Sequence, residues 1–137
     1  MTTPTREDYI REVYRMQERS PGEVRLVDLA RRLRLSKPAV TERIAELAGA
    51  GFVTHEPYRG VDLTPRGRAL GRGLTYKHRI IESFLVRVLG IRKERMHREA
   101  HRLEHACSDE VIEAMRSLVP DATHCPEGDP IPGLTRR

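Results

Sequence analysis

Apolar residues recur at intervals of three and four positions near the start of the chain, and this spacing places them on one face of a helix. Breaks that contain proline, glycine or serine separate the periodic segments, and such residues commonly end or cap helices. Ser36 can cap the third segment, and Gly49 and Gly51 can end it. The pattern therefore predicts three short helices, over residues 5–19, 26–33 and 36–49.

A different pattern follows the third helix. Over residues 52–63 apolar and polar positions roughly alternate around Tyr58, Arg59 and Gly60, which predicts a short β-hairpin with Arg59 near its tip. Two helices joined by a tight break form a helix-turn-helix, and a hairpin placed directly after them forms a wing. The first half of the chain is thus predicted to be a winged helix-turn-helix.

The second half is predicted to be helical up to a proline-rich end. Thr64 and Pro65 supply a cap and a first-turn proline for a long helix over residues 64–89. Two shorter helices are expected over residues 93–105 and 109–118, the latter capped by Ser108 and with an apolar face of Val111, Ala114, Met115 and Leu118. Residues 120–137 hold four prolines and are expected to form an irregular tail.

These elements define a mainly α fold, a winged helix-turn-helix followed by a helical domain. Residues 1–73 are expected to form the DNA-binding domain, and residues 74–137 the helical metal-binding and dimerisation domain with its irregular tail. Few aromatic residues are available, 4 % of the chain and no tryptophan, so the core must be built mainly from aliphatic side chains. Such a composition suits helices better than an aromatic-rich β-sandwich.

The third helix has the composition expected of a DNA-reading helix. Val40, Ile44 and Leu47 face inward, so the opposite face is free to reach base edges and phosphates in the major groove. The alternative is an ordinary solvated helix, since mixed charge is common on amphipathic helices. The DNA-binding candidates are Ser36, Lys37, Pro38, Thr41, Glu42 and Arg43 on this helix and Arg59 on the wing.

Charge and composition support a polyanionic partner and exclude a membrane protein. The chain has 137 residues with a net charge of +5, and no acidic residue lies between Asp62 and Glu82, where five basic residues do. No apolar run approaches the roughly 20 residues of a spanning helix, and residues 1–11 lack the apolar stretch of a signal peptide. The two cysteines are too few for a disulfide framework, so a cytoplasmic location is expected, with neither a membrane nor a small organic substrate as partner.

Histidines and carboxylates gather at helical spacing in the second half of the chain. His101, Glu104 and His105 lie at i, i+3 and i+4, and His97 extends the same stripe by one turn. A divalent ion needs several imidazoles or carboxylates converging on it, and one helix can supply two or three of them. Further ligands must come from elsewhere, with acidic candidates near the chain start, and the alternative is that the histidines are solvated or pack in the core.

An enzyme must also be considered, because residues 101–105 spell H-x-x-E-H, a zinc signature of some metalloproteases. In that motif two histidines hold zinc and the glutamate is the general base. A protease needs a substrate cleft and an open zinc position, and a short helical chain that begins with a winged helix leaves little sequence to build them. No enzymatic activity is therefore expected.

Taken together, several motifs resemble the diphtheria toxin repressor family, which includes iron-dependent and manganese transport regulators. The resemblance extends over nearly the whole chain and implies a dimeric, metal-activated repressor that reads a palindromic operator and lacks the SH3-like domain of longer relatives. The motifs are Leu63-Thr64-Pro65-x-Gly67, Lys77-His78, His97-x-Glu99-Ala100, Leu103-Glu104-His105, Ser108-Asp109-Glu110-Val111 and Gly128-x-Pro130-Ile131-Pro132-Gly133-Leu134, together with the helix-turn-helix.

The resemblance also implies two metal sites. It places the principal site at Asp8, His101, Glu104 and His105, and a second site at His78, Glu82 and His97. Asp8 resembles the manganese-responsive members, and hard oxygen ligands suit Mn(II), while His101 matches neither the cysteine of iron-type members nor the glutamate of short manganese-type ones. Mn(II) and Fe(II) both remain as activators, and Zn(II) or Co(II) can bind in vitro.

The expected function is therefore a metal-dependent repressor of metal-ion homeostasis genes. The alternatives are a metal-independent winged-helix regulator, in which the histidines merely pack, and the zinc metalloprotease. Coordination by Asp8 and by His101, Glu104 and His105 would tie the DNA-binding domain to the dimerisation helices and fix two recognition helices about one DNA turn, roughly 34 Å, apart.

Overall fold

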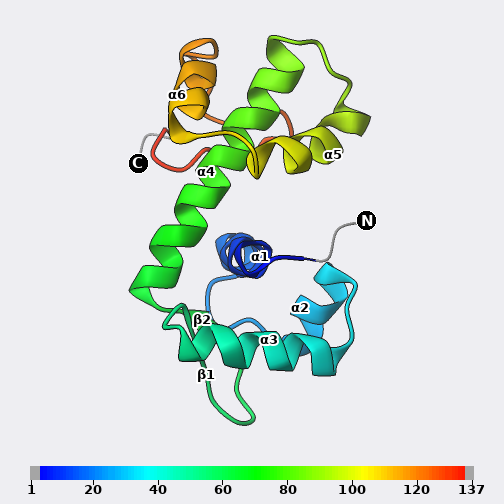
Figure 1. Cartoon of the computed structure of the whole chain (residues 1–137), viewed down its shortest axis with the longest axis vertical. Helices are drawn as coiled ribbons and strands as arrows, with labels where there is room; N and C mark the ends of the chain where they lie inside the picture. Colours follow the sequence, from blue (N-terminus) through cyan, green and yellow to red (C-terminus); the bar gives the residue numbers. More distant parts are fainter. Residues whose placement is uncertain (1–3, 135–137) are drawn as a thin grey trace. The chain divides into compact units, whose positions relative to one another are not determined.

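The computed structural model describes residues 4–134 and confirms the mainly α fold. A two-stranded antiparallel sheet follows the third helix, as the wing pattern predicts (Figure 1). The chain divides into two compact units, residues 1–74 and 75–137. The elements of the described range are α1 (Arg6–Arg19), α2 (Leu26–Leu33), α3 (Lys37–Gly49), β1 (Val53–His55), β2 (Val61–Leu63), α4 (Pro65–Arg87), α5 (Lys93–Glu104) and α6 (Asp109–Ser117).

Two helices of the first unit, α1 and α3, begin where side-chain caps satisfy free backbone amides. Thr5 and Asp8 form a capping box on α1, in which each backbone N–H donates to the other side chain. Ser36 caps α3 by accepting from the Ala39 amide at 3.3 Å. Arg34 ends α2 in the left-handed region, with φ 57°. This conformation turns the chain sharply between α2 and α3 and completes the helix-turn-helix.

The wing is short and is attached to the chain before α2. In the hairpin Val53 pairs with Leu63 and His55 pairs with Val61. Val61 also exchanges both backbone hydrogen bonds with Val24, at 2.7 and 2.8 Å. Val24 thus gives β2 a second backbone partner besides β1, so that the hairpin does not depend only on its own few hydrogen bonds.

The first turn of α4 requires a glycine at position 67. A Cβ atom on Gly67 would lie 1.9 Å from the carbonyl oxygen of Phe52, a distance no real contact allows. The Gly67 amide donates to Thr64 Oγ1 at 3.0 Å, and this contact caps the helix. The Thr64 amide donates to the same Phe52 carbonyl. Close approach of two backbone segments therefore fixes where the wing ends and α4 begins.

The core of the first unit is almost entirely aliphatic. Val40, Ile44 and Leu47, the predicted inward face of α3, are each fully buried. They pack with buried residues of α1, α2 and the wing into one cluster, which contains Tyr9, Ile10, Val13, Val24, Leu29, Ala30, Val53, Val61 and Leu63. This cluster holds α3 in place and leaves its opposite face exposed.

The second unit contains residues 75–87 of α4 together with α5 and α6, which share a second hydrophobic core. Ile80, Ile81 and Ala100 are fully buried, as their helical spacing requires. The α6 residue in this core is Ile112, whereas Val111 and Leu118 of the predicted apolar face are 42 % and 59 % exposed. The apolar face expected on α6 is therefore largely exposed, and the neighbouring residue Ile112 packs in the core.

The segment after α6 is irregular, as predicted, but it belongs to the core. Ile131 is fully buried and its amide donates to the Thr123 carbonyl at 2.9 Å. Cys125 and Ala122 are also buried in the described part of the segment. Proline and glycine thus prevented a helix here without preventing packing.

Candidate metal centre and DNA-binding surface

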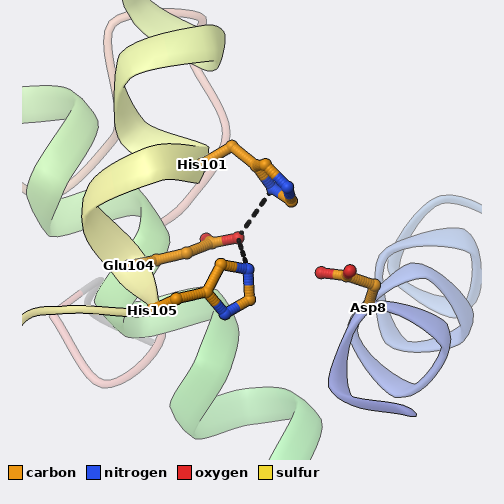
Figure 2. A group of neighbouring side chains, drawn as sticks. All are labelled: Asp8, His101, Glu104 and His105. Carbon is orange, nitrogen blue, oxygen red and sulfur yellow. Dashed lines mark ion pairs between the residues drawn. The ribbon is translucent and has the colours of Figure 1, made fainter. Parts of the chain in front are cut away.

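Three neighbouring side chains of α5 form the first group of candidate metal ligands. Glu104 Oε1 lies 3.0 Å from His101 Nδ1 and 3.7 Å from His105 Nε2, contacts that Figure 2 draws as dashed lines. One ligand atom from each residue lies within 4.8 Å of the others. Ligands of one ion at about 2.1 Å lie no more than about 4.2 Å apart, so small side-chain movements suffice to hold a divalent cation.

Asp8, the fourth predicted ligand of this group, is labelled in Figure 2 on α1 of the other unit. Its carboxylate has a fixed orientation on its own helix, because Oδ2 accepts from the Thr5 amide at 2.8 Å. The other oxygen, Oδ1, lies 3.7 Å from an Arg11 guanidinium nitrogen. One carboxylate oxygen therefore serves the capping box and the other faces a cation. The part of Asp8 in a metal site remains a prediction.

The second group combines two residues of α4 with one of α5. Glu82 is 2 % exposed and His78 is 5 % exposed. His78 Nε2 lies 3.5 Å from Glu82 Oε1, and His97 Nδ1 lies 2.9 Å from Glu82 Oε2. A buried carboxylate is unfavourable unless something compensates its charge.

Within the described residues Glu82 Oε2 is a buried atom without a hydrogen bond, although His97 Nδ1 lies 2.9 Å away. The converging nitrogen and oxygen atoms are candidate ligands of a common ion. This donor set of two imidazoles and a carboxylate suits Mn(II), Fe(II) and Zn(II).

A buried hydrogen bond joins the two groups. His78 Nδ1 lies 2.7 Å from Glu104 Oε2, while the other oxygen of Glu104 faces His101 and His105. If His78 binds an ion through Nε2, its proton is on Nδ1, and this N–H donates a hydrogen bond to Glu104. The two candidate sites therefore share one hydrogen-bonded network through α4 and α5.

The sequence analysis did not identify one residue that contacts this network. Glu127, in the segment after α6, places Oε1 2.5 Å from His97 Nε2. No periodicity marks this position, since it lies in a turn between two prolines. Only the folded path of the segment brings it to α5.

The predicted DNA-reading side chains lie on the free face of α3. Ser36, Lys37, Pro38, Thr41 and Glu42 are all exposed. Arg43 is half-buried, 3.2 Å from Glu46 and with its guanidinium 5.9 Å from the centre of the Tyr9 ring. Thr41 donates its hydroxyl to the Lys37 carbonyl at 2.9 Å, which leaves the hydroxyl oxygen as an acceptor.

The wing presents Arg59 and its neighbour Tyr58 to solvent. Tyr58 is fully exposed and has a positive φ of 63°. Arg59 lies 3.1 Å from Glu23 and 4.0 Å from Glu56. The predicted wing contact is thus an exposed arginine that already has carboxylate partners.

The basic residues of α4 do not all lie on the surface, although they follow one another in the sequence. Arg79 is 4 % exposed and donates to the Pro130 carbonyl at 2.6 Å. Arg66 donates to the Ala50 carbonyl and stacks 4.4 Å over the Phe52 ring. A run of basic residues in a helix is therefore divided between surface and interior, and Arg79 has a structural role.

The two cysteines are both free thiols in different surroundings. Cys107 is half-buried, and Cys125 is 3 % exposed. Burial raises the pKa of the Cys125 thiol, so the thiol stays protonated at neutral pH. Cys125 is buried because the segment after α6 folds into the core.

No helix among the described residues is both long and apolar enough to cross a membrane.

A winged helix-turn-helix followed by helices that carry paired imidazoles and carboxylates defines a DNA-binding protein with a metal-sensing helical part. Two family models match the chain: residues 1–61 match "Iron dependent repressor, N-terminal DNA binding domain", and residues 64–133 match "Iron dependent repressor, metal binding and dimerisation domain". The chain belongs to the iron-dependent repressor family. This finding confirms the predicted resemblance.

Two curated relatives are similar to the chain. The diphtheria toxin repressor of Corynebacterium efficiens is 38 % identical over 130 residues, which cover 95 % of this chain and 56 % of the relative. The HTH-type transcriptional regulator MntR of Geobacillus kaustophilus is 36 % identical over 119 residues, which cover 87 % and 83 %. The chain thus spans little more than half the length of the diphtheria toxin repressor.

Solved structures agree with this assignment. One described as "Manganese-dependent transcriptional repressor complex with manganese" has a TM-score of 0.85 at 36 % identity, over 94 % of this chain and 59 % of that one. The manganese regulator SloR has a TM-score of 0.82 at 32 % identity, over 98 % and 62 %. The relatives are transcriptional regulators and not enzymes, which confirms the predicted class and overturns the protease alternative suggested by residues 101–105.

Proposed function

We propose that the chain is a metal-activated, DNA-binding transcriptional repressor of metal-ion homeostasis that acts as a homodimer in the cytoplasm. The observation that carries the proposal is the buried carboxylate Glu104, which contacts three histidines in the domain that matches the family's metal-binding model. A buried carboxylate surrounded by imidazoles has the donor atoms that a divalent cation requires. The first unit matches the family's DNA-binding domain and exposes the face of α3.

The principal site in this proposal consists of Asp8, His101, Glu104 and His105, and the second site of His78, Glu82 and His97. The bound ion supplies the positive charge that neutralises these carboxylates. Since Asp8 belongs to the DNA-binding domain and the other three to α5, shared coordination would connect the two domains. Metal would then favour the DNA-competent arrangement, and by reciprocity DNA would tighten metal binding.

Mn(II) and Fe(II) are the proposed physiological activators. The oxygen of Asp8 is a hard ligand that suits Mn(II), and the relatives include both iron-dependent and manganese-dependent regulators. Zn(II) binds nitrogen and oxygen sites more tightly than either ion, so affinity alone does not identify the activator. Comparison of DNA binding between metals is therefore more informative than comparison of metal affinities.

The proposed DNA contacts are Ser36, Lys37, Pro38, Thr41, Glu42 and Arg43 in the major groove and Arg59 at the wing. Two copies of this surface would read a palindromic operator, because a two-fold dimer matches two half-sites one helical turn apart. Exposed apolar residues of the second unit, Val88, Leu89, Val111 and Leu118, support dimerisation through its helices.

The test begins with selection of a binding sequence from random duplex DNA in the presence of Mn(II). Fluorescence anisotropy then measures affinity for the selected duplex with chelator, Mn(II), Fe(II) and Zn(II). We expect tight binding only with metal. Equal affinity in all four conditions would instead establish a metal-independent winged-helix regulator.

Two variants test the principal site, each with a matched control. Asp8→Ala and His105→Ala should abolish metal activation while leaving a folded protein by circular dichroism. Glu7→Ala changes the exposed neighbouring carboxylate of α1, and His55→Ala changes a histidine of the wing, so both should respond to metal like the parent protein. Retained activation in Asp8→Ala or His105→Ala would remove that residue from the site.

A further inference from the structure

The segment after α6 brings a carboxylate to a histidine of the second metal group. Glu127 Oε1 lies 2.5 Å from His97 Nε2, although 30 residues separate the two in sequence. The other ring nitrogen, His97 Nδ1, lies 2.9 Å from Glu82 Oε2. Each nitrogen of one imidazole therefore faces a different carboxylate, one inside the candidate site and one outside it.

The ring geometry assigns different roles to the two nitrogens. Nδ1 faces Glu82, so Nδ1 is the atom that can bind an ion held by Glu82 and His78. A neutral imidazole that binds through Nδ1 carries its proton on Nε2. Metal-binding histidines commonly donate this second N–H to a carboxylate or carbonyl, which fixes both the tautomer and the orientation of the ring.

The backbone holds Glu127 in place for this contact. Cys125 and Gly128 close a turn around it, with the Gly128 amide donating to the Cys125 carbonyl at 2.8 Å. The Cys125 amide donates to the Asp129 carbonyl at 2.8 Å, and the buried Arg79 holds the next carbonyl, that of Pro130. Little backbone freedom remains to be lost when Glu127 meets His97.

The exposure of the pair indicates what the contact contributes. The side chains of His97 and Glu127 are 48 % and 40 % exposed. Water screens a charge pair of this kind, so its effect on folding stability is small. The contact therefore contributes the orientation of the His97 ring and the choice of its tautomer, neither of which requires strong attraction.

We propose that Glu127 is a positioning residue of the second metal site, which accepts a hydrogen bond from the Nε2–H of His97 and so presents Nδ1 to the ion. The inference rests on the proposed function, in which His78, Glu82 and His97 bind a divalent cation. In this arrangement the C-terminal segment contributes to metal affinity without supplying a ligand.

The first test is calorimetric titration with Mn(II) alone, in the full chain with His105→Ala so that the principal site is impaired. In that background Glu127→Ala should weaken binding by about 10- to 100-fold, the usual loss when a partner of a ligand is removed. Glu127→Gln should recover part of the affinity, because its amide oxygen still accepts a hydrogen bond. Glu110→Ala removes an exposed carboxylate of α6 and should leave affinity unchanged.

The second test uses NMR of the ring nitrogens of His97 with Zn(II), which is diamagnetic. We expect Nδ1 to be metal-bound and Nε2 protonated, with the Nε2 resonance shifted by Glu127→Ala and not by Glu110→Ala. Three results would overturn the inference: unchanged Mn(II) affinity in Glu127→Ala, Glu127→Gln as weak as Glu127→Ala, or metal on Nε2. Absence of Mn(II) binding in the His105→Ala parent would instead overturn the second site itself, and the inference with it.

Discussion

The two units of the chain bury different kinds of side chain. In the first unit the core is a continuous aliphatic cluster around α3. All buried polar or charged residues of the described chain except Asp8 lie in the second unit, namely Thr75, His78, Arg79, Glu82, Ser83 and Glu104. Aliphatic packing stabilises a fixed shape, whereas buried carboxylates and imidazoles reduce stability unless they are paired or bind a cation. The comparison teaches that the buried groups suited to a cation are concentrated in the second unit, with Asp8 as the exception in the first.

The largest expected effect concerns the aliphatic core. Leu47→Ala removes a fully buried side chain of α3 and should lower the free energy of unfolding by about 2–5 kcal/mol. Urea unfolding followed by circular dichroism, with and without Mn(II), measures this loss. The loss should be the same in both conditions, because Leu47 belongs to the unit without the histidine groups. A loss that disappears with Mn(II) would contradict the division between the two cores.

The next effect concerns the buried carboxylate of the second unit. Metal at 100 times its Kd stabilises the folded protein by about 2.7 kcal/mol. If Glu104→Gln weakens metal binding about 100-fold, the same concentration stabilises the variant by only about 0.4 kcal/mol. Thermal unfolding with and without Mn(II) tests this difference in a His97→Ala background, in which the second proposed site is impaired.

Glu99 provides the matched control for Glu104, since it lies on the same helix but pairs with Arg102 on the surface at 3.5 Å. Glu99→Gln should keep the full metal-dependent gain. A Glu104→Gln variant that also kept it would show that Glu104 does not bind the ion.

The smallest expected effect concerns the side-chain caps of two helices, and its size should be equal in the two units. Ser36 caps α3 and Ser108 caps α6, each accepting a backbone amide at 3.3 Å. Ser36→Ala and Ser108→Ala should each lower stability by about 1 kcal/mol, measured by urea unfolding, and neither should change Mn(II) affinity. Unequal effects would mean that the units also differ in how their helices are stabilised locally, and not only in their cores.

Local pattern was sufficient to predict most of the fold. The caps Ser36 and Ser108 and the breaks after α1 and α3 are visible in the sequence because they act over three or four residues. The inward face of α3 follows from its spacing for the same reason. The face of α6 could not be predicted in this way, since Ile112 packs against residues that are distant in sequence.

The candidate metal ligands could be predicted from the sequence only where they repeat at helical spacing. His101, Glu104 and His105 share one helix, and His78 and Glu82 share another, so periodicity and family resemblance both indicate them. The bond from His78 to Glu104 and the contact from Glu127 to His97 join segments 26 and 30 residues apart. Such contacts arise from tertiary packing, for which a single sequence has no local signal.

The carboxylate partners of Arg59 have a consequence for how the wing would meet DNA. The guanidinium of Arg59 lies 3.1 Å from Glu23, so reaching a phosphate means exchanging one anion for another. Such an exchange leaves Glu23 beside the polyanion and reduces the net attraction that a solvent-exposed arginine would provide. Glu23 would then act as an internal competitor at the wing, which discourages stable attachment to arbitrary DNA and leaves discrimination to α3.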